Sequence, residues 1–263
     1  MAMAMLPALH AQDDETGGST TEKSKFPKNG VRFVICSPTD QHVPSPLYVR
    51  VGREYLPVVI TSRTPTPRLK PDGGVIKFYE KPPVKKDSND KTEEQPYITV
   101  TIPKDSGHKC ICIVQPSQKG DTTPKTYFLP ESDFKKGGIH VINFTSTPLR
   151  MVVDPTGEFD GKEKKFNISP RPKDAGSKLS TSDSNVWSYM GKGMSENVSF
   201  ILQTSPTAQN SEGTRIRAGV FMTMNDASQI SIVVKHPTLP HAFRMLSVQC
   251  SEASDKGTDG GNQ

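Results

Sequence analysis

Apolar and polar side chains alternate along most of the chain, in short runs that end at proline, glycine, asparagine or aspartate. In the run 97–102, Ile98, Val100 and Ile102 alternate with threonines, so one face of a strand would be buried and the other wet. β-Branched and aromatic residues dominate these runs, as they do in strands. The pattern predicts strands over residues 31–36, 47–51, 55–61, 75–79, 97–102, 109–115, 139–144, 149–153, 165–168, 198–203, 214–223, 229–235 and 242–248.

Two runs are more continuously apolar than the others. They cover residues 220–223 and residues 231–235. A strand that is covered on both faces loses its polar alternation. We therefore expect both runs to be central strands.

Helical periodicity is nearly absent from the chain. Residues 131–136, which precede Gly137 and Gly138, predict a single turn. Prolines recur throughout the body of the chain and exclude long helices. Many short strands separated by turns predict an all-β fold, an antiparallel β-sandwich of immunoglobulin-like type.

The strands fall into two groups around a polar region at residues 116–138. We expect two sandwich halves, an N-terminal one at 31–125 and a C-terminal one at 126–250. One large two-sheet sandwich with long excursions is the alternative.

Both ends differ from this body. Residues 1–11 are apolar and uncharged and precede an acidic start. They resemble the last half of a secretory signal peptide cleaved after Ala11; an unstructured initiator segment is the alternative. We expect 1–30 to hold this remnant and a disordered tail, and 251–263 to be a second disordered tail.

The composition changes this picture in two ways. Of 263 residues, 33% are hydrophobic, and no apolar run approaches the ~18 residues that a transmembrane helix needs. The net charge is +5, and because both tails are acidic, the body is more basic than the whole. A basic body favours anionic partners, whereas the lack of a basic helix argues against nucleic acid.

Four cysteines lie within or next to predicted strands, at positions 36, 110, 112 and 250. Cys36 and Cys250 flank the body and are candidates for a disulfide. Buried free thiols are the other interpretation. His108, Cys110 and Cys112 suggest a copper or zinc module, but strand spacing holds the end residues of this triplet too far apart for one ion.

No catalytic or cofactor motif occurs in the sequence, and we expect no cofactor. Asp154, Glu158 and Asp160 form an acidic cluster at turn residues. Such a cluster is typical of a surface turn. A carbohydrate-active or other hydrolase stays an alternative, and it would require converging acids or a Ser–His pair.

Long polar loops are the expected interaction surfaces. One covers residues 62–74 and is basic and rich in proline; another covers 169–194. The candidate interaction residues are Arg63, Arg68, Lys70, Trp187 and Tyr189. For Trp187, a core position between two sheets is the alternative.

Several segments together resemble uncharacterised exported β-rich proteins of verrucomicrobial and planctomycete bacteria. They are 127–134 (YFLPESDF), 138–145 (GIHVINFT), 148–150 (PLR), 166–170 (FNISP), 186–189 (VWSY), 215–221 (RIRAGVF) and 232–236 (IVVKH). The resemblance covers about residues 126–237. It implies an envelope or surface location and an immunoglobulin-like sandwich, and it supplies no catalytic residues.

The expected function is that of a non-enzymatic exported protein that binds or scaffolds at the bacterial envelope. Some such proteins are similar to accessory proteins of surface pili, and by this analogy a pilus- or secretion-associated role is part of the expectation. The location would be the periplasm, the outer membrane or the cell surface. Exposed strand edges would accept an envelope protein by β-augmentation, or the basic loops would bind an anionic glycan. The sequence leaves the oligomeric state open.

Overall fold

The structure is a computed structural model, and all the residues that it describes belong to one compact unit, Lys25–Ser254. It describes residues 25–37, 43–83, 95–106, 109–115, 124–154, 156–170, 174, 176–191, 195–236, 238–239 and 242–251. The expected signal remnant and most of both expected tails lie outside these residues.

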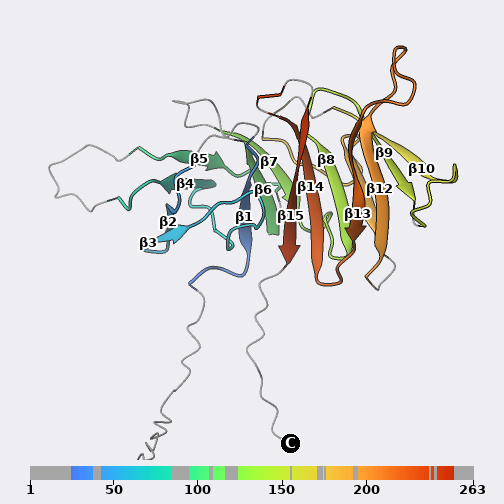
Figure 1. Cartoon of the computed structure of the whole chain (residues 1–263). Helices are drawn as coiled ribbons and strands as arrows, with labels where there is room; N and C mark the ends of the chain where they lie inside the picture. The colour runs from blue at the N-terminus through green and yellow to red at the C-terminus, as the bar shows by residue number, and fades with distance from the viewer. Residues whose placement is uncertain are drawn as a thin grey trace, which may run out of the picture. The chain divides into compact units, whose positions relative to one another are not determined.

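The described residues form strands and no helix, so the predicted all-β class is confirmed (Figure 1). The strands are β1 (Gly30–Ile35), β2 (Leu47–Val51), β3 (Glu54–Val58), β4 (Val75–Tyr79), β5 (Ile98–Thr101), β6 (Lys109–Gln115), β7 (Lys125–Pro130), β8 (Gly138–Asn143), β9 (Leu149–Asp154), β10 (Lys164–Ile168), β11 (Val186–Met190), β12 (Asn197–Thr204), β13 (Arg215–Met222), β14 (Ala227–Lys235) and β15 (Phe243–Ser251).

Four sheets contain these strands. Sheet A has the order β1-β6-β7, sheet B β3-β2-β4-β5, sheet C β11-β8-β14-β15 and sheet D β10-β9-β12-β13. Pairing is antiparallel except between β1 and β6 and between β8 and β14. The antiparallel character predicted from the short alternating runs is therefore confirmed.

Sheet A is covered on both faces. Successive side chains of a strand point to opposite faces, and in β6 Cys110 and Cys112 enter the core shared with sheet B. Ile111 and Ile113 of the same strand enter a second core shared with sheet C. Burial on both faces explains why β6 is almost entirely apolar.

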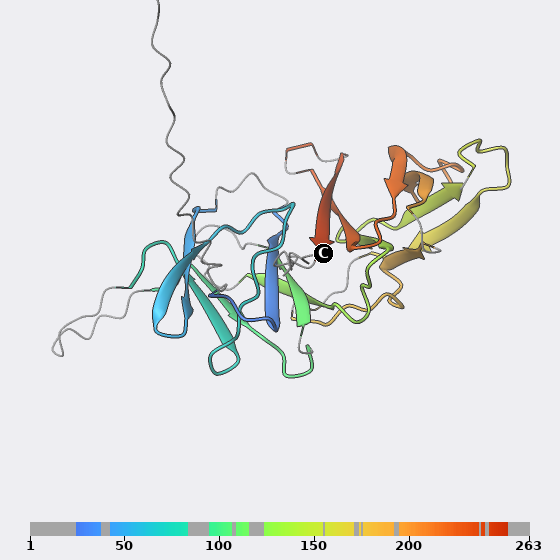
Figure 2. The same ribbon diagram turned by 90° about the horizontal axis from the view of Figure 1, so that it is seen from below.

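Sheet C is covered in the same way. In β8, Ile142 enters the core shared with sheet A, whereas Ile139 and Val141 enter a third core shared with sheet D. The layers therefore follow in the order B, A, C, D, which can be followed from left to right in Figure 2. Residues before and after position 125 share the middle core.

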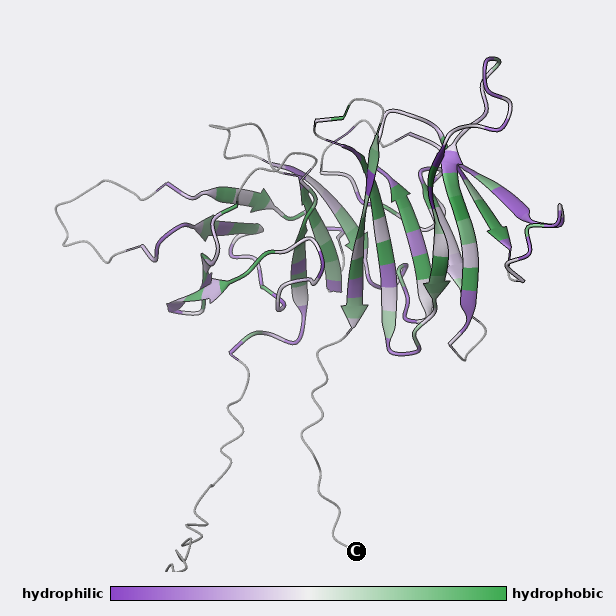
Figure 3. Ribbon diagram, in the orientation of Figure 1, coloured by the Kyte–Doolittle hydropathy of each residue, from purple (hydrophilic) through white to green (hydrophobic). Residues whose placement is uncertain are grey.

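The two most apolar runs lie at different positions in their sheets, one in a central strand and one in an edge strand. Residues 231–235 belong to β14, which lies between β8 and β15, so the prediction of a central strand is confirmed. Residues 220–222 form the end of β13, an edge strand, and Thr223 follows it, so this prediction is wrong. Phe221 is buried, but Val220 is 59% and Met222 54% exposed. The arrowhead of β13 is accordingly an apolar edge (Figure 3).

Two strands were not predicted. Strand β7 lies inside the polar region at 116–138, and β11 lies inside the expected loop at 169–194. In β7 the apolar residues follow Pro124 and end at Pro130, which hides the strand, because proline usually marks a turn.

Candidate functional site

The open edge of sheet D is the candidate site. Strand β13 has eight residues and pairs only with β12 in the described sheet order. Phe221 turns inward and stacks on Phe200, with ring centroids 4.0 Å apart and planes at 15°. The other residues of β13 are exposed or, at Ile216, half-buried. The strand is therefore anchored by this aromatic pair and by Ile216, which packs against the same core, and its other residues face solvent.

The hydrogen bonds between β12 and β13 show which backbone groups of β13 face outward. The Thr223 amide donates to the Glu196 carbonyl over 2.9 Å, directly after the last pair of the ladder, Met222 with Asn197. Hydrogen-bonded and non-bonded pairs alternate in an antiparallel ladder. The backbone groups of Met222, Val220 and Ala218 therefore point away from β12, toward the open edge.

The first residues of β13 are protected in a way that the last ones are not. Arg215 and Arg217 are exposed charges, and the register shifts opposite them, between Leu202 and Gln203. Charges and bulges are the usual devices that keep edge strands from pairing. The following five residues, 218–222 (AGVFM), carry no charge. This uncharged segment, 218–222, is the open edge.

The hairpin before β13 sets where the strand begins. The Thr204 amide donates to the Thr214 carbonyl over 2.9 Å, and the Asn210 side-chain oxygen accepts from the Gly213 amide over 2.9 Å. Gly213 has φ of 80°, and a Cβ there would collide with the Thr204 carbonyl. Glycine is thus required for this hairpin to close.

At the other end, β13 meets one of the predicted residues. The Thr223 hydroxyl accepts from the Glu196 amide over 2.7 Å, and the Tyr189 hydroxyl donates to the Glu196 carboxylate over 2.7 Å. This hydrogen bond raises the pKa of Tyr189. Tyr189 therefore lies in a polar chain that leads to the end of β13.

Trp187 and Tyr189 lie in strand β11 rather than in a loop. Trp187 is 6% exposed and belongs to the core between sheets C and D. Its ring stacks on Tyr189, with centroids 6.4 Å apart and planes at 19°. Trp187 thus occupies the core position that was the alternative to a role in recognition.

The predicted basic loop at 62–74 lies beside sheet A, away from these aromatic residues. Leu69 and Val31 exchange two backbone hydrogen bonds of 2.8 Å. Gly30, with φ of 135°, lies so close that a Cβ would overlap the Leu69 carbonyl. The loop therefore covers the edge of β1 and is packed against the fold.

Its three predicted cations have different surroundings. Arg68 makes two 2.7 Å contacts to the Glu131 carboxylate. Arg63 is exposed, and its carbonyl accepts from the Gln249 amide over 3.2 Å. Lys70 is exposed. The structure does not bring these cations together with Trp187 and Tyr189, and the partner of Arg68 lies too far along the sequence to be anticipated.

All four cysteines are buried free thiols. Cys36 and Cys250 belong to the core between sheets A and C, and burial raises the pKa of each to about 12. Cys110 and Cys112 share the core between sheets A and B, while His108 lies outside the described residues. No group of three potential metal ligands occurs among the residues that the structure describes.

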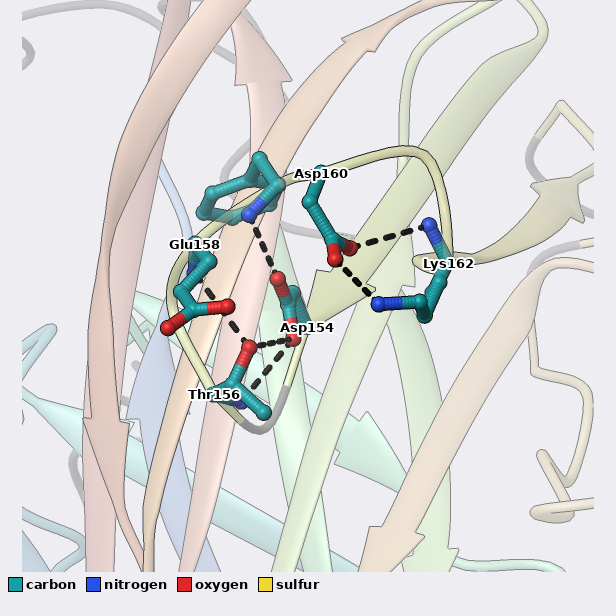
Figure 4. A network of polar contacts seen from close by, with 6 residues as sticks. Asp154, Thr156, Glu158, Asp160 and Lys162 are labelled. Atoms are coloured by element: carbon teal, nitrogen blue, oxygen red, sulfur yellow. Dashed lines mark hydrogen bonds and ion pairs between the residues drawn. The ribbon is translucent and has the colours of Figure 1, made fainter.

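The acidic cluster is engaged in its own loop (Figure 4). The Asp154 carboxylate accepts from the Phe159 amide over 2.6 Å and from the amide and hydroxyl of Thr156 over 2.9 and 2.8 Å. These hydrogen bonds, the one from Phe159 first, lower the pKa of Asp154. Asp160 pairs with Lys162. The cluster therefore stabilises a turn.

A Ser–His pair is present within sheet C. The His140 Nδ1 lies 2.9 Å from the Ser188 hydroxyl. His140 is fully buried, and burial lowers its pKa to about 4. The other polar contact of the ring is a backbone hydrogen bond to Lys135, rather than one to the carboxylate that orients the base in a Ser-His-Asp triad. The pair fits a structural contact between β8 and β11.

Comparisons with known proteins do not assign a family. No protein-family model matches the chain, and no curated protein matches it in sequence. The resemblance of residues 126–237 to exported β-rich proteins therefore stays a prediction. In the described part of the chain, no helix has the length and apolarity needed to cross a membrane.

Proposed function

We propose that this chain is a non-enzymatic, exported protein of the bacterial envelope that holds an extended segment of another protein at the open edge of β13. Export is supported by the apolar segment 1–11 and by the resemblance of residues 126–237. A role in binding rather than catalysis is supported by the candidate catalytic groups. The carboxylate of Asp154 and the His140–Ser188 pair make hydrogen bonds that stabilise a turn and connect two strands.

The observation that carries the proposal is the uncharged edge 218–222. Three of its residues, Ala218, Val220 and Met222, point their backbone groups outward, as a strand does that accepts another strand. Arg215 and Arg217 precede it. The partner is therefore an extended segment with apolar residues, flanked by a carboxylate that meets these arginines. A pilus or secretion subunit has this character when its terminal segment is extended.

Substitution of Val220 tests the binding mode. Val220→Pro removes an outward-facing amide and leaves the bonds to β12 in place, because proline is tolerated at such edge positions. The matched control, Val220→Thr, keeps the amide and a similar shape. In pull-downs from envelope extracts, we expect a partner that is captured by the wild type and by Val220→Thr and is lost with Val220→Pro.

Equal capture by both variants, with unchanged circular dichroism, would refute the proposed binding mode. Location is tested independently. The protein is expected in the periplasmic or outer-membrane fraction, and N-terminal sequencing of it is expected to begin at Gln12. A chain that is recovered intact from the cytoplasm would refute export while leaving the edge to be judged by the two variants.

A further inference from the structure

Sheets C and D enclose one core, which is closed differently at its two sides. At one side, the Phe166 ring of β10 lies 6.1 Å from the Trp187 ring of β11 and joins the two sheets. Strands β13 and β15 are the opposite edges of these sheets. The Gln249 side chain of β15 donates to the Met224 sulfur, just after β13, over 3.7 Å. The two edges therefore lie together at the other side of the core.

This second side of the core is only partly covered. Three apolar side chains that pack against the core there are half-buried, namely Ile216 of β13 and Phe243 and Met245 of β15. Gly219 of β13 also faces this core, since a Cβ at that position would lie 3.4 Å from the Phe200 ring. Glycine adds no side chain to the cover. Ile216, Gly219, Phe243 and Met245 define the mouth of the core.

The two strands at the mouth differ in how open their edges are. In β15, the Gln249 amide donates to the Arg63 carbonyl over 3.2 Å, so the loop at 62–74 already pairs with part of that edge. In β13, the backbone groups of 218, 220 and 222 point outward beside the mouth. Successive side chains of a strand point to opposite faces. A segment that pairs with β13 therefore directs every second side chain toward the core.

We infer that the segment held at β13 has apolar side chains at every second position, and that these side chains fill the mouth and contact Phe243 and Met245 of β15. This inference rests on the proposed function and adds the pattern of the partner and a second strand that recognises it. The side chains between the apolar ones face solvent and are polar.

The charges at the start of β13 favour a different protein over a second copy of this chain. Arg215 and Arg217 are exposed, and β13 contains no carboxylate. A second β13 would therefore add cations to the same edge, whereas a partner with aspartate or glutamate at one end complements them. In antiparallel pairing, the carboxyl end of the partner segment lies beside the first residues of β13.

Calorimetric titration of the full chain with two synthetic peptides tests the expected pattern. The probe is acetyl-TVTVTVTDD, in which valine alternates with threonine before two aspartates. The matched control is acetyl-TTVVVTTDD, which has the same composition without alternation. We expect the alternating peptide to bind about tenfold or more tightly than the control peptide. Equal affinities, or no binding of the alternating peptide, would refute the inference.

Photolabelling of the wild-type chain locates the peptide side chains without any substitution in the protein. A diazirine side chain in place of a valine should label Phe243 or Met245, whereas the same group in place of a threonine should not. Label from the valine position that is absent from β15 would refute the filled mouth.

A substitution in β15 separates this inference from the proposed function. Met245→Ser should weaken binding of the alternating peptide about tenfold, with circular dichroism showing that the fold is kept. Val59→Ser, a change of a 52% exposed residue next to β3, should bind like the wild type. Binding that is lost with Val220→Pro but unchanged by Met245→Ser would refute only the filled mouth. Binding that is unchanged by Val220→Pro would refute pairing at β13 itself.

Discussion

His140 is held uncharged by its burial in sheet C, and this makes folding stability depend on pH. Burial lowers its pKa from 6.5 to about 4. The unfolded chain therefore binds a proton that the folded chain does not bind, as the pH falls from about 6.5 to about 4. The contribution of His140 is intact above pH 6.5 and is lost across this window, to a total of about 3 kcal/mol.

We expect His140→Gln to lose less stability than the wild type when the pH is lowered from 7 to 4. Urea unfolding at each pH measures the difference, which should approach about 3 kcal/mol. The comparison uses the change of the free energy of unfolding with pH. A loss of stability that is equal at every pH therefore does not affect it. Parallel curves for wild type and His140→Gln would contradict the expectation.

The four buried thiols give a second residue-scale prediction. Because burial raises the pKa values of Cys36, Cys110, Cys112 and Cys250, little reactive thiolate exists near neutral pH. We expect alkylation to be slow in the folded protein and to reach all four cysteines after unfolding without reductant. A count of two after unfolding would show instead that one pair of cysteines is oxidised, as a disulfide between Cys36 and Cys250 would require.

At the scale of the element, the two faces of β13 should differ in their contribution to the free energy of unfolding. Phe221→Ala removes a buried ring from its stack on Phe200 and should cost about 3–5 kcal/mol. Val220→Ala, one residue earlier and 59% exposed, should change stability by less than about 0.5 kcal/mol. Denaturant unfolding of both variants checks this. A similar loss in both would mean that Val220 is also buried.

The arginines at the start of β13 should keep chains apart. Replacing Arg215 and Arg217 with threonine removes the charges while the strand preference is kept. We expect the double variant to self-associate at concentrations where the wild type does not. Gel filtration with light scattering measures it. Lys77→Thr/Lys104→Thr, two exposed lysines of sheet B and its flank, removes the same charge and should elute like the wild type.

Strand positions were largely predictable, because a strand pattern is local. Ile98 and Val100 of β5, and Ile102 directly after the strand, are all buried, as their alternation with threonines predicted. The error at 220–223 arose because an apolar run does not tell how many neighbours a strand has. Within 220–222, only Phe221 is buried; Val220 and Met222 lie at the open edge. Strand β11 was missed because it follows a polar segment rich in serine.

At the scale of the whole molecule, the order of the layers couples distant residues. Sheets A and C each contribute to two cores, so loss of one core exposes the back of the next. Phe78 lies in the core between sheets A and B. Trp187, the only tryptophan, lies in the core between sheets C and D. A disturbance at Phe78 should therefore reach Trp187.

We expect Phe78→Ala to lower the midpoint of unfolding followed by Trp187 fluorescence, by the same amount as the midpoint followed by circular dichroism. Coincident transitions are the mark of a cooperative unit. Two separate transitions, with Trp187 fluorescence unmoved, would instead favour the division into independent halves at position 125. The experiment thus decides between the two domain arrangements expected from the sequence.

The candidate sites were harder to predict than the strands. Arg68 was singled out as a basic loop residue, but its partner Glu131 is 63 positions away. The cavity where sheets A and C meet is lined by residues of β1, β6, β14 and β15 and of the turn after β7, and no spacing along the chain marks these residues. The strands that meet at the cavity depend on the order of the layers. This order depends on which sheet faces pack together, and the sequence does not distinguish these faces because they are equally apolar.

Gly30 determines how closely the loop at 62–74 approaches β1. Its missing side chain lets the backbone of β1 touch the carbonyl of Leu69, the residue next to Arg68. Any larger residue at position 30 would wedge the loop away from β1 and draw the guanidinium of Arg68 off Glu131. The released carboxylate would then face the cavity with its charge restored. A residue with no charge and no side chain thereby governs whether the carboxylate of Glu131 is paired with the guanidinium of Arg68.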